Sequence, residues 1–280
     1  MQVKAGFKKE WLQFSRTFRF GGILIGILSF ALADPLMYAG LNAMMSAFSN
    51  ATASVAVSPT DIMGEAASLF DSAEMVFSMT MAEFCSTSLL IVMLILMSPC
   101  GGEQKKRATI IPSTAGLDSA SYLIPKYVMY PGTVFAVSFI ACCISGVLCN
   151  AMFTLDKVDP GMLLLAALMC AVYMAFFTVV YMSIGLCTSR PGVATVLMYI
   201  GVSIVQIILT SLDLTKFHPL TLRSLVTGEM FAEDFVLEDN IASIAVGIVL
   251  SLVIGVMMYV LTLTVQKGTK INNQVDKPEF

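Results

Sequence analysis

The chain has 280 residues, of which 57% are hydrophobic and 12% are charged, and its mean hydropathy is +0.84. Soluble domains carry about 25% charged residues, so this composition excludes an ordinary soluble domain. The formal net charge of -3 is small, and we expect no nucleic-acid partner. Apolar runs of about 20 residues are typical of transmembrane helices. We therefore expect an all-α integral membrane protein that lies in the lipid bilayer.

Residues 1–19 predict an amphipathic helix on the membrane surface. Apolar side chains recur there at steps of three or four residues, the spacing of one helical face: Val3, Phe7, Trp11, Phe14 and Phe18. Cations occupy the other faces: Lys4, Lys8, Lys9, Arg16 and Arg19. Such a helix lies at the interface with its cations toward anionic headgroups. The alternative is a plain cytoplasmic tail.

Six apolar runs between residues 20 and 265 predict a six-helix transmembrane domain. They are Phe20–Met45, Met79–Met97, Tyr127–Phe153, Leu163–Cys187, Gly192–Leu212 and Ala242–Val265. Each is long enough to cross a hydrocarbon layer of about 30 Å at about 1.5 Å per residue.

The distribution of lysine and arginine predicts the orientation. Of these 16 residues, 13 fall on one side of the six spans: Lys4, Lys8, Lys9, Arg16, Arg19, Lys105, Lys106, Arg107, Lys126, Arg190, Lys267, Lys270 and Lys277. The other three are Lys157, Lys216 and Arg223. Cytoplasmic loops carry the excess of Lys and Arg. We therefore expect a multi-pass protein of the cell membrane, with both termini and the tail 266–280 in the cytoplasm. Residues 46–78 and 213–241 would be acidic external loops.

Motifs for phosphate binding or metal catalysis are absent from the sequence. The only histidine, His218, precedes Pro219, and we interpret it as a turn residue. The seven cysteines have no ligand spacing, which favours buried packing over a metal site or a disulfide framework. We expect no enzymatic activity, no cofactor and no metal site in this chain.

Asp34 and Glu83 are the only charged residues inside the predicted spans. Charges within a membrane usually mark function, so these two residues form a candidate polar site. Asp34 lies fifteen residues after Arg19, about 22 Å along the helix, and Pro35 follows it. Glu83 lies near the start of its predicted span. The alternative is therefore that both residues belong to the membrane boundary and reach external water.

Residues 100–126 form a charged, turn-rich loop between the second and third predicted spans. Gly101-Gly102 would end the second span, and Glu103–Ile111 could form a short helix that stops at Pro112. A charged helix held between two apolar spans suits the docking of a soluble partner. An ordinary basic connector would also satisfy the charge distribution.

One pattern in this loop reads Glu-x-x-x-Arg-x-Thr-x-x-Pro, followed by a later lysine. Its residues are Glu103, Arg107, Thr109, Pro112 and Lys126. Together with the amphipathic entry helix and the six spans, it resembles the membrane subunits of type-2 ABC exporters, the ABC-2 permease family built like the ABCG transporters.

The resemblance implies a permease subunit that works with a separate ABC ATPase subunit, on which ATP and Mg would bind. The contact with that ATPase would come from Glu103, Lys105, Lys106, Arg107 and Thr109. A second permease, identical or a sibling, would complete a dimer along which the substrate passes. The family also implies that residues 213–240 fold back partly into the outer leaflet. The apolar composition favours an amphipathic or hydrophobic substrate, with a peptide as the first candidate.

Two other functions stay open at this point. One is a secondary transporter or channel that uses Asp34 and Glu83. The other is a membrane assembly subunit without a transport role.

Overall fold

The computed structural model describes residues 2–52, 72–102, 118–188, 190–212, 214, 216–232 and 235–275. Nearly all of them are helical, which confirms the predicted all-α class. Six helices within these ranges are long and apolar enough to cross a membrane, as predicted: Arg19–Ala47, Ala73–Leu96, Ser119–Met152, Pro160–Thr188, Gly192–Leu209 and Leu237–Lys267. Their number and composition indicate a multi-pass membrane protein.

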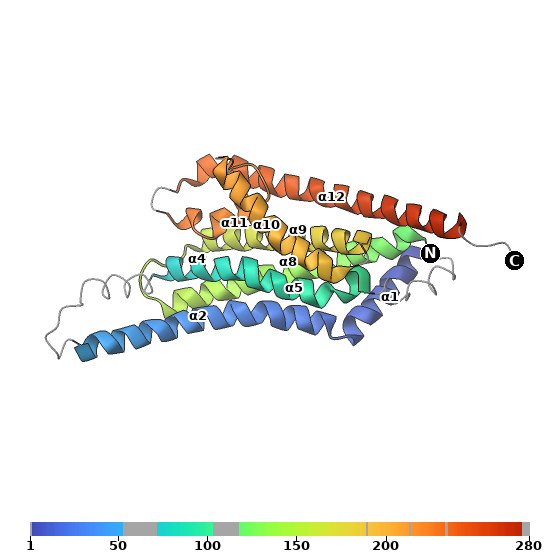
Figure 1. Ribbon diagram of the computed structural model, residues 1–280. Coiled ribbons are helices and arrows are strands. Elements are labelled where there is room, and N and C mark those ends of the chain that lie inside the picture. The colour runs from blue at the N-terminus through green and yellow to red at the C-terminus, as the bar shows by residue number, and fades with distance from the viewer. Residues whose placement is uncertain are drawn as a thin grey trace.

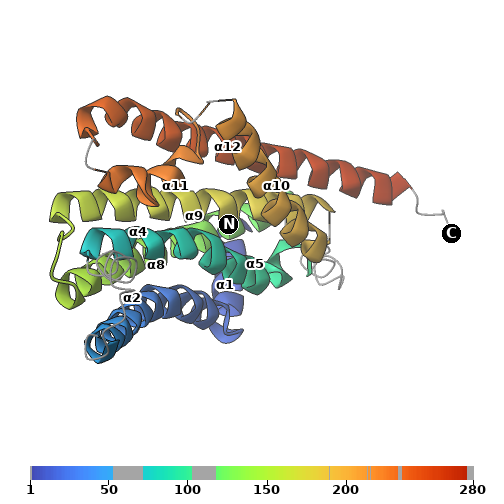
Figure 2. The ribbon, with the colours of Figure 1, turned by 60° about the vertical axis from the view of Figure 1, so that its left-hand side comes forward.

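The long helices run up and down, so that the start of the first and the end of the last lie at the same end of the bundle. α2 (Arg19–Thr52) leads away from α1 (Gln2–Arg16), and the later long helices alternate in direction (Figure 1). The end of α12 (Leu237–Val275) therefore lies at the same end of the bundle as the start of α2 (Figures 1 and 2). This arrangement agrees with an even number of spans. The side of the membrane on which this end lies stays a prediction from the charge distribution.

The second apolar span is a nearly continuous helical tract with two π-helical segments. Its parts are α4 (Ala73–Glu83), η1 (Phe84–Ser88), α5 (Leu89–Leu96) and η2 (Ser98–Gly102). The tract begins at Ala73, because the Ser72 hydroxyl accepts a hydrogen bond of 3.4 Å from the Met75 amide. It thus starts six residues before the predicted Met79. Glu83 consequently lies about 15 Å into the helix instead of near its start.

The third and fourth spans form the centre of the bundle. α8 (Ser119–Met152) begins eight residues before the predicted Tyr127 and contains Pro125 and Pro131. Membrane helices tolerate such prolines where neighbouring helices satisfy the freed backbone groups. α9 (Pro160–Thr188) is the most buried of the six spans and packs against α8, α10, α11 and α12. α2 and α12 lie on opposite sides of this centre (Figures 1 and 2).

The chain after α10 (Pro191–Ser211) turns back onto the bundle. α11 (Thr221–Val226) packs against α9 and α4 and buries Leu222 and Leu225, and η3 (Glu229–Phe231) follows it. This agrees with short helices between the last two spans, whereas their entry into the outer leaflet stays a prediction. Most of the other predicted external loop lies outside the described residues.

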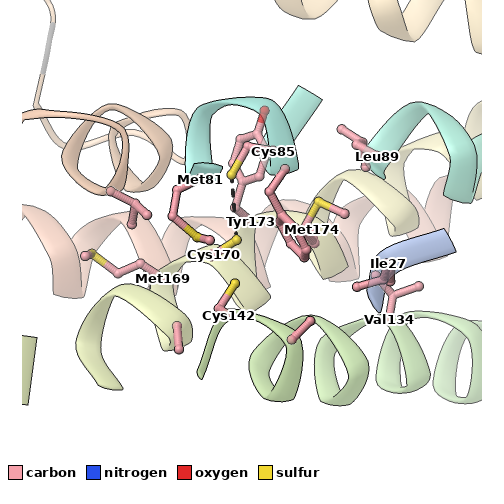
Figure 3. Close-up of a cluster of buried hydrophobic side chains, with 14 of the residues drawn as sticks. Ile27, Met81, Cys85, Leu89, Val134, Cys142, Met169, Cys170, Tyr173 and Met174 are labelled. Atoms are coloured by element: carbon pink, nitrogen blue, oxygen red, sulfur yellow. Dashed lines mark hydrogen bonds between the residues drawn. The ribbon is translucent and has the colours of Figure 1, made fainter. Parts of the chain in front are cut away.

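Sulfur-containing side chains fill the middle of the bundle (Figure 3). The buried members of this group are Met81, Cys85, Cys142, Met169, Cys170 and Met174. The Cys85 and Cys170 thiols contact each other at 3.7 Å between Sγ atoms, from η1 and α9. Methionine and free cysteine behave as adaptable apolar side chains that fill irregular gaps. Five of the seven cysteines are buried and the other two are half-buried, in line with the predicted packing role.

Gly185 lets the backbone of α9 pack closely against the backbone of η2, at the end of the second span. A Cβ atom at Gly185 would overlap the carbonyl oxygen of Cys100 in η2, which is backbone and cannot rotate away. We expect Gly185→Ala to lower the free energy of unfolding by about 1–3 kcal/mol. The measurement is thermal unfolding in detergent, followed with a thiol-reactive fluorogenic maleimide that reports exposure of the buried cysteines.

Gly132→Ala on α8 is the matched control, because a Cβ atom there meets nothing within 4 Å. It should keep the wild-type stability or gain up to about 1 kcal/mol from helix propensity. Equal stability of the two variants would contradict the close α9–η2 contact.

Candidate functional site at the junction of α1, α2 and α8

α1 packs against α8 through one face made of Gly6, Glu10 and Phe14, which are four residues apart. A Cβ atom at Gly6 would overlap the Ser121 carbonyl oxygen, so the glycine lets the two backbones approach closely. Phe14 completes the face with an edge-on contact to Tyr130, with ring centroids 5.3 Å apart.

The packing of α1 on α8 buries some side chains of the predicted apolar stripe and leaves the others exposed. Phe14 is buried and Phe7 is half-buried, whereas Val3, Trp11 and Phe18 are 40%, 61% and 71% exposed. Val3 and Trp11 thus lie on the side of α1 that faces away from the bundle, whereas Phe18 lies in the turn that follows α1. That side is available to lipid, and the interfacial position of α1 stays a prediction.

An ion pair between Glu10 and Lys126 lies inside the α1–α8 contact. The Lys126 ammonium is 3.2 Å from Glu10 Oε1, and the two side chains are 0% and 1% exposed. Lys126 also donates to the Pro99 carbonyl oxygen in η2 at 3.4 Å and lies over the Tyr122 ring. Lys9, at the edge of the contact, approaches Glu10 at 3.5 Å.

Arg19 extends the polar contact to α2. Its Nη1 donates to the Tyr130 hydroxyl at 2.8 Å, and its Nη2 donates to the Ser98 hydroxyl at 3.1 Å. The Tyr130 hydroxyl in turn donates to Glu10 Oε2 at 3.4 Å. We call the set Glu10, Arg19, Ser98, Lys126 and Tyr130 the junction. It connects α1, α2, η2 and α8 through charged and polar side chains.

The burial of these charges requires that they remain together. Removing a charged side chain from water costs several kcal/mol, and an ion pair offsets this cost only when further hydrogen bonds complete it. Here Tyr130 supplies such a bond to Glu10, and the Pro99 carbonyl supplies one to Lys126. A network of this kind rigidifies the elements that it connects.

The junction holds both ends of the predicted coupling loop. η2 ends at Gly102 and α8 begins at Ser119, and the Lys126–Pro99 bond links the two stems. Lys126 is therefore part of the buried network. The predicted ATPase-contact residues lie outside the described residues: Glu103, Lys105, Lys106, Arg107 and Thr109.

The polar site predicted from the sequence lies between α2 and α4. Asp34 is 5% exposed, and Glu83 is half-buried. Tyr38, one turn after Asp34 on α2, donates a hydrogen bond of 3.4 Å to Glu83 Oε1, and Glu83 is also an electrostatic neighbour of Asp34. The structure thus brings the two predicted acids to the same interface. Within the described residues, Asp34 Oδ2 has no hydrogen-bond partner.

Sequence reasoning missed the role of Glu10. Two signals could have found it. Glu10 is the first acidic residue of the chain and stands among five cations, and its spacing of four from Gly6 and Phe14 marks a helical face. Its partner Lys126 lies far away in the sequence, so the pair itself could not be read from local spacing.

Comparison with known proteins yields no match to a protein family, to a curated protein or to a solved structure.

The buried pair generates a second prediction. Lys126→Met removes the cation and leaves Glu10 buried, so we expect a loss of about 3–5 kcal/mol in the free energy of unfolding. The double variant Glu10→Gln with Lys126→Met removes both charges and should recover most of that loss. Thermal unfolding in detergent measures both effects.

Lys9→Met serves as the control for this series. Lys9 is partly exposed, so its contact with Glu10 is worth at most about 1 kcal/mol. A double variant that is no more stable than Lys126→Met alone would contradict a mutual compensation of the two charges.

Proposed function

We propose that the chain is the membrane permease subunit of an ATP-driven exporter, and that it moves an amphipathic or hydrophobic substrate. ATP, with Mg, is bound and hydrolysed on a separate ABC ATPase subunit. The observation that carries the proposal is the junction, which ties the two stems of the 103–117 segment to α1 and α2. A partner that pushes on this segment therefore moves four helical elements together.

The path from the loop to the spans supports this proposal. Lys126 connects the start of α8 to η2, and η2 packs closely on α9 at Gly185. Arg19, the first residue of α2, bonds to Ser98 of η2. Displacement at the loop is passed to the central helices through short, buried contacts. An ordinary surface connector has no need for a buried ion pair at its base.

The remaining partners follow from the same proposal. Glu103, Lys105, Lys106, Arg107 and Thr109 contact the ATPase. A second permease, identical or a sibling, completes the transporter. α10 and α12 expose apolar side chains along most of their length, which suits contact with lipid or with that second permease. The substrate class follows from the apolar composition, with a peptide as the first candidate.

Charge reversal in the loop tests the proposal. In proteoliposomes that contain the chain and its ATPase, Glu103→Lys or Arg107→Glu should reduce nucleotide-dependent transport at least about tenfold, the effect of losing about 1.4 kcal/mol of contact. Transport is measured with a fluorescent amphipathic peptide, and retention of the ATPase is measured by affinity co-purification.

Arg190→Glu is the matched control, because Arg190 lies in another loop on the same predicted side and outside the proposed contact. It should leave transport within twofold of the wild type. Full transport by this chain without any ATPase would refute the proposal.

Asp34 favours a second candidate function, ion-coupled secondary transport. A buried carboxylate oxygen without a hydrogen bond from the described residues is a group that a proton or cation would stabilise, and Glu83 and Tyr38 lie beside it. In this function, binding at Asp34 and Glu83 would drive substrate movement instead of ATP.

Neutralisation of the two acids separates the candidates. The double variant Asp34→Asn with Glu83→Gln should abolish ion-gradient-driven uptake if secondary transport is correct, and should leave ATP-driven transport within about threefold if the permease proposal is correct. Asp239→Asn, at an exposed acid in the first turn of α12, is the control. The assay is substrate flux into proteoliposomes under an imposed ion gradient or with ATP.

A further inference from the structure

Three cysteine side chains that are far apart in the sequence meet in the middle of the bundle. Cys85 of η1 and Cys170 of α9 touch at 3.7 Å between Sγ atoms, and both are 1% exposed. Cys142 of α8 is 0% exposed and is a hydrogen-bonding neighbour of Cys170. Met81, four residues before Cys85, extends toward the same thiols (Figure 3). We propose that these side chains form a site for a soft monovalent metal ion, copper(I), with Cys85, Cys170 and Met81 as its ligands.

The three cysteines lie at one depth of the bundle. α4 begins, α8 ends and α9 begins at the same end, where the Ala73 amide donates to the Leu155 carbonyl oxygen at 2.9 Å (Figure 1). Counted from that end at about 1.5 Å per residue, Cys85 lies about 18 Å along its tract, and Cys142 and Cys170 lie about 15 Å along theirs. These depths correspond to the middle of a hydrocarbon layer of about 30 Å. Three helical tracts thus present sulfur atoms to one place that is remote from water.

The distance between the two touching thiols fits two ligands of one metal ion. Sulfur atoms 3.7 Å apart that bind the same ion at about 2.3 Å enclose an angle of about 110° at that ion. This angle leaves room for a third donor. Met81 and Cys85 lie on the same face of the tract, so the Met81 thioether can supply it.

Cys142 supports a ligand instead of binding the ion itself. Among the described residues, no group of three His, Cys, Asp or Glu side chains could hold a metal ion, and the third ligand proposed here is a thioether. The Cys142 thiol lies beside Cys170 and can donate to the Cys170 sulfur once that sulfur is a thiolate. Hydrogen bonds of this kind orient metal ligands and tune the ion that they bind.

The charge balance of the site selects a monovalent ion. Thiolate and thioether donors favour soft ions such as copper(I). When copper(I) binds, one thiol releases its proton to solvent, so the ion and the single thiolate sum to zero charge. Zn²⁺ would reach zero charge only if both buried thiols lost their protons. Because ionised groups are costly in a membrane interior, the copper(I) complex is the more stable of the two.

The sequence predicted no metal site because its cysteines have no ligand spacing. The structure accounts for this, since the two thiolate ligands lie 85 residues apart and come from different spans. A site assembled from separate helices leaves no local pattern. The inference depends on the packing of η1 against α9 and not on the proposed exporter function.

Copper(I) titration of the full chain in detergent tests the inference. The protein is titrated without oxygen in the presence of ascorbate, in competition with the copper(I) chelator bicinchoninate, and the ultraviolet charge-transfer band reports the thiolate–copper bond. We expect one copper(I) per chain, and Zn²⁺ in tenfold excess should not displace it. Cys85→Ser and Cys170→Ser should each weaken copper(I) binding at least about tenfold.

Two matched controls separate the site from general thiol binding. Cys149 is also buried on α8, two turns beyond Cys142, so Cys149→Ser should change the affinity less than twofold. Met81→Leu keeps the volume of the side chain and removes the thioether, and should weaken binding about tenfold. Met198→Leu, at a buried methionine of α10, should have no effect. Thermal unfolding of each variant checks that the fold is kept, and Met81→Leu decides the matter if a serine variant does not fold.

Three results would overturn the inference. Absence of bound copper(I) in the wild type would exclude the site. Equal losses of affinity in Met81→Leu and Met198→Leu, or in Cys170→Ser and Cys149→Ser, would show binding to thiols and thioethers in general. Displacement of copper(I) by Zn²⁺ would contradict the selection of a monovalent ion by the charge balance.

Discussion

The burial of Glu10 against Lys126 is the constraint on which the architecture at one end of this protein depends. Both side chains are almost completely removed from solvent, and each is acceptable there only because the other is present. α1 must therefore lie across the start of α8, which sets the sharp turn at Phe18 and the point at which α2 begins. Arg19 then comes within reach of Tyr130 and Ser98, and the network closes.

This arrangement gives the proposed exporter a rigid base beneath its partner-binding loop. Many membrane proteins carry a basic connector between two spans, but such a connector alone transmits no force. Here the two stems of the loop are bonded to each other and to the first span, and η2 lies against the backbone of α9. The polar interface of Asp34 and Glu83 belongs instead to the contact of α2 with α4, and it is the basis of the second proposed function.

Hydropathy is a local property, so the class and the six apolar helices could be predicted from the sequence alone. Their limits were less predictable because they depend on particular contacts. The Ser72 cap starts the second span earlier than its hydropathy indicates. The third span was predicted to begin at Tyr127, directly after Lys126, but Lys126 pairs with Glu10 and α8 already begins at Ser119. The aromatic stripe of α1 indicated a helix correctly, whereas its packing face also uses a glycine and an acid.

Trp11 has a useful position in this arrangement. It is the only tryptophan of the chain, it lies on α1, and it is 61% exposed on the side away from the bundle. Indole fluorescence of the intact protein consequently reports the surroundings of a single helix, without contributions from the core. Its emission wavelength senses the polarity around α1, and quenchers attached at known depths along lipid chains would locate that helix within the bilayer.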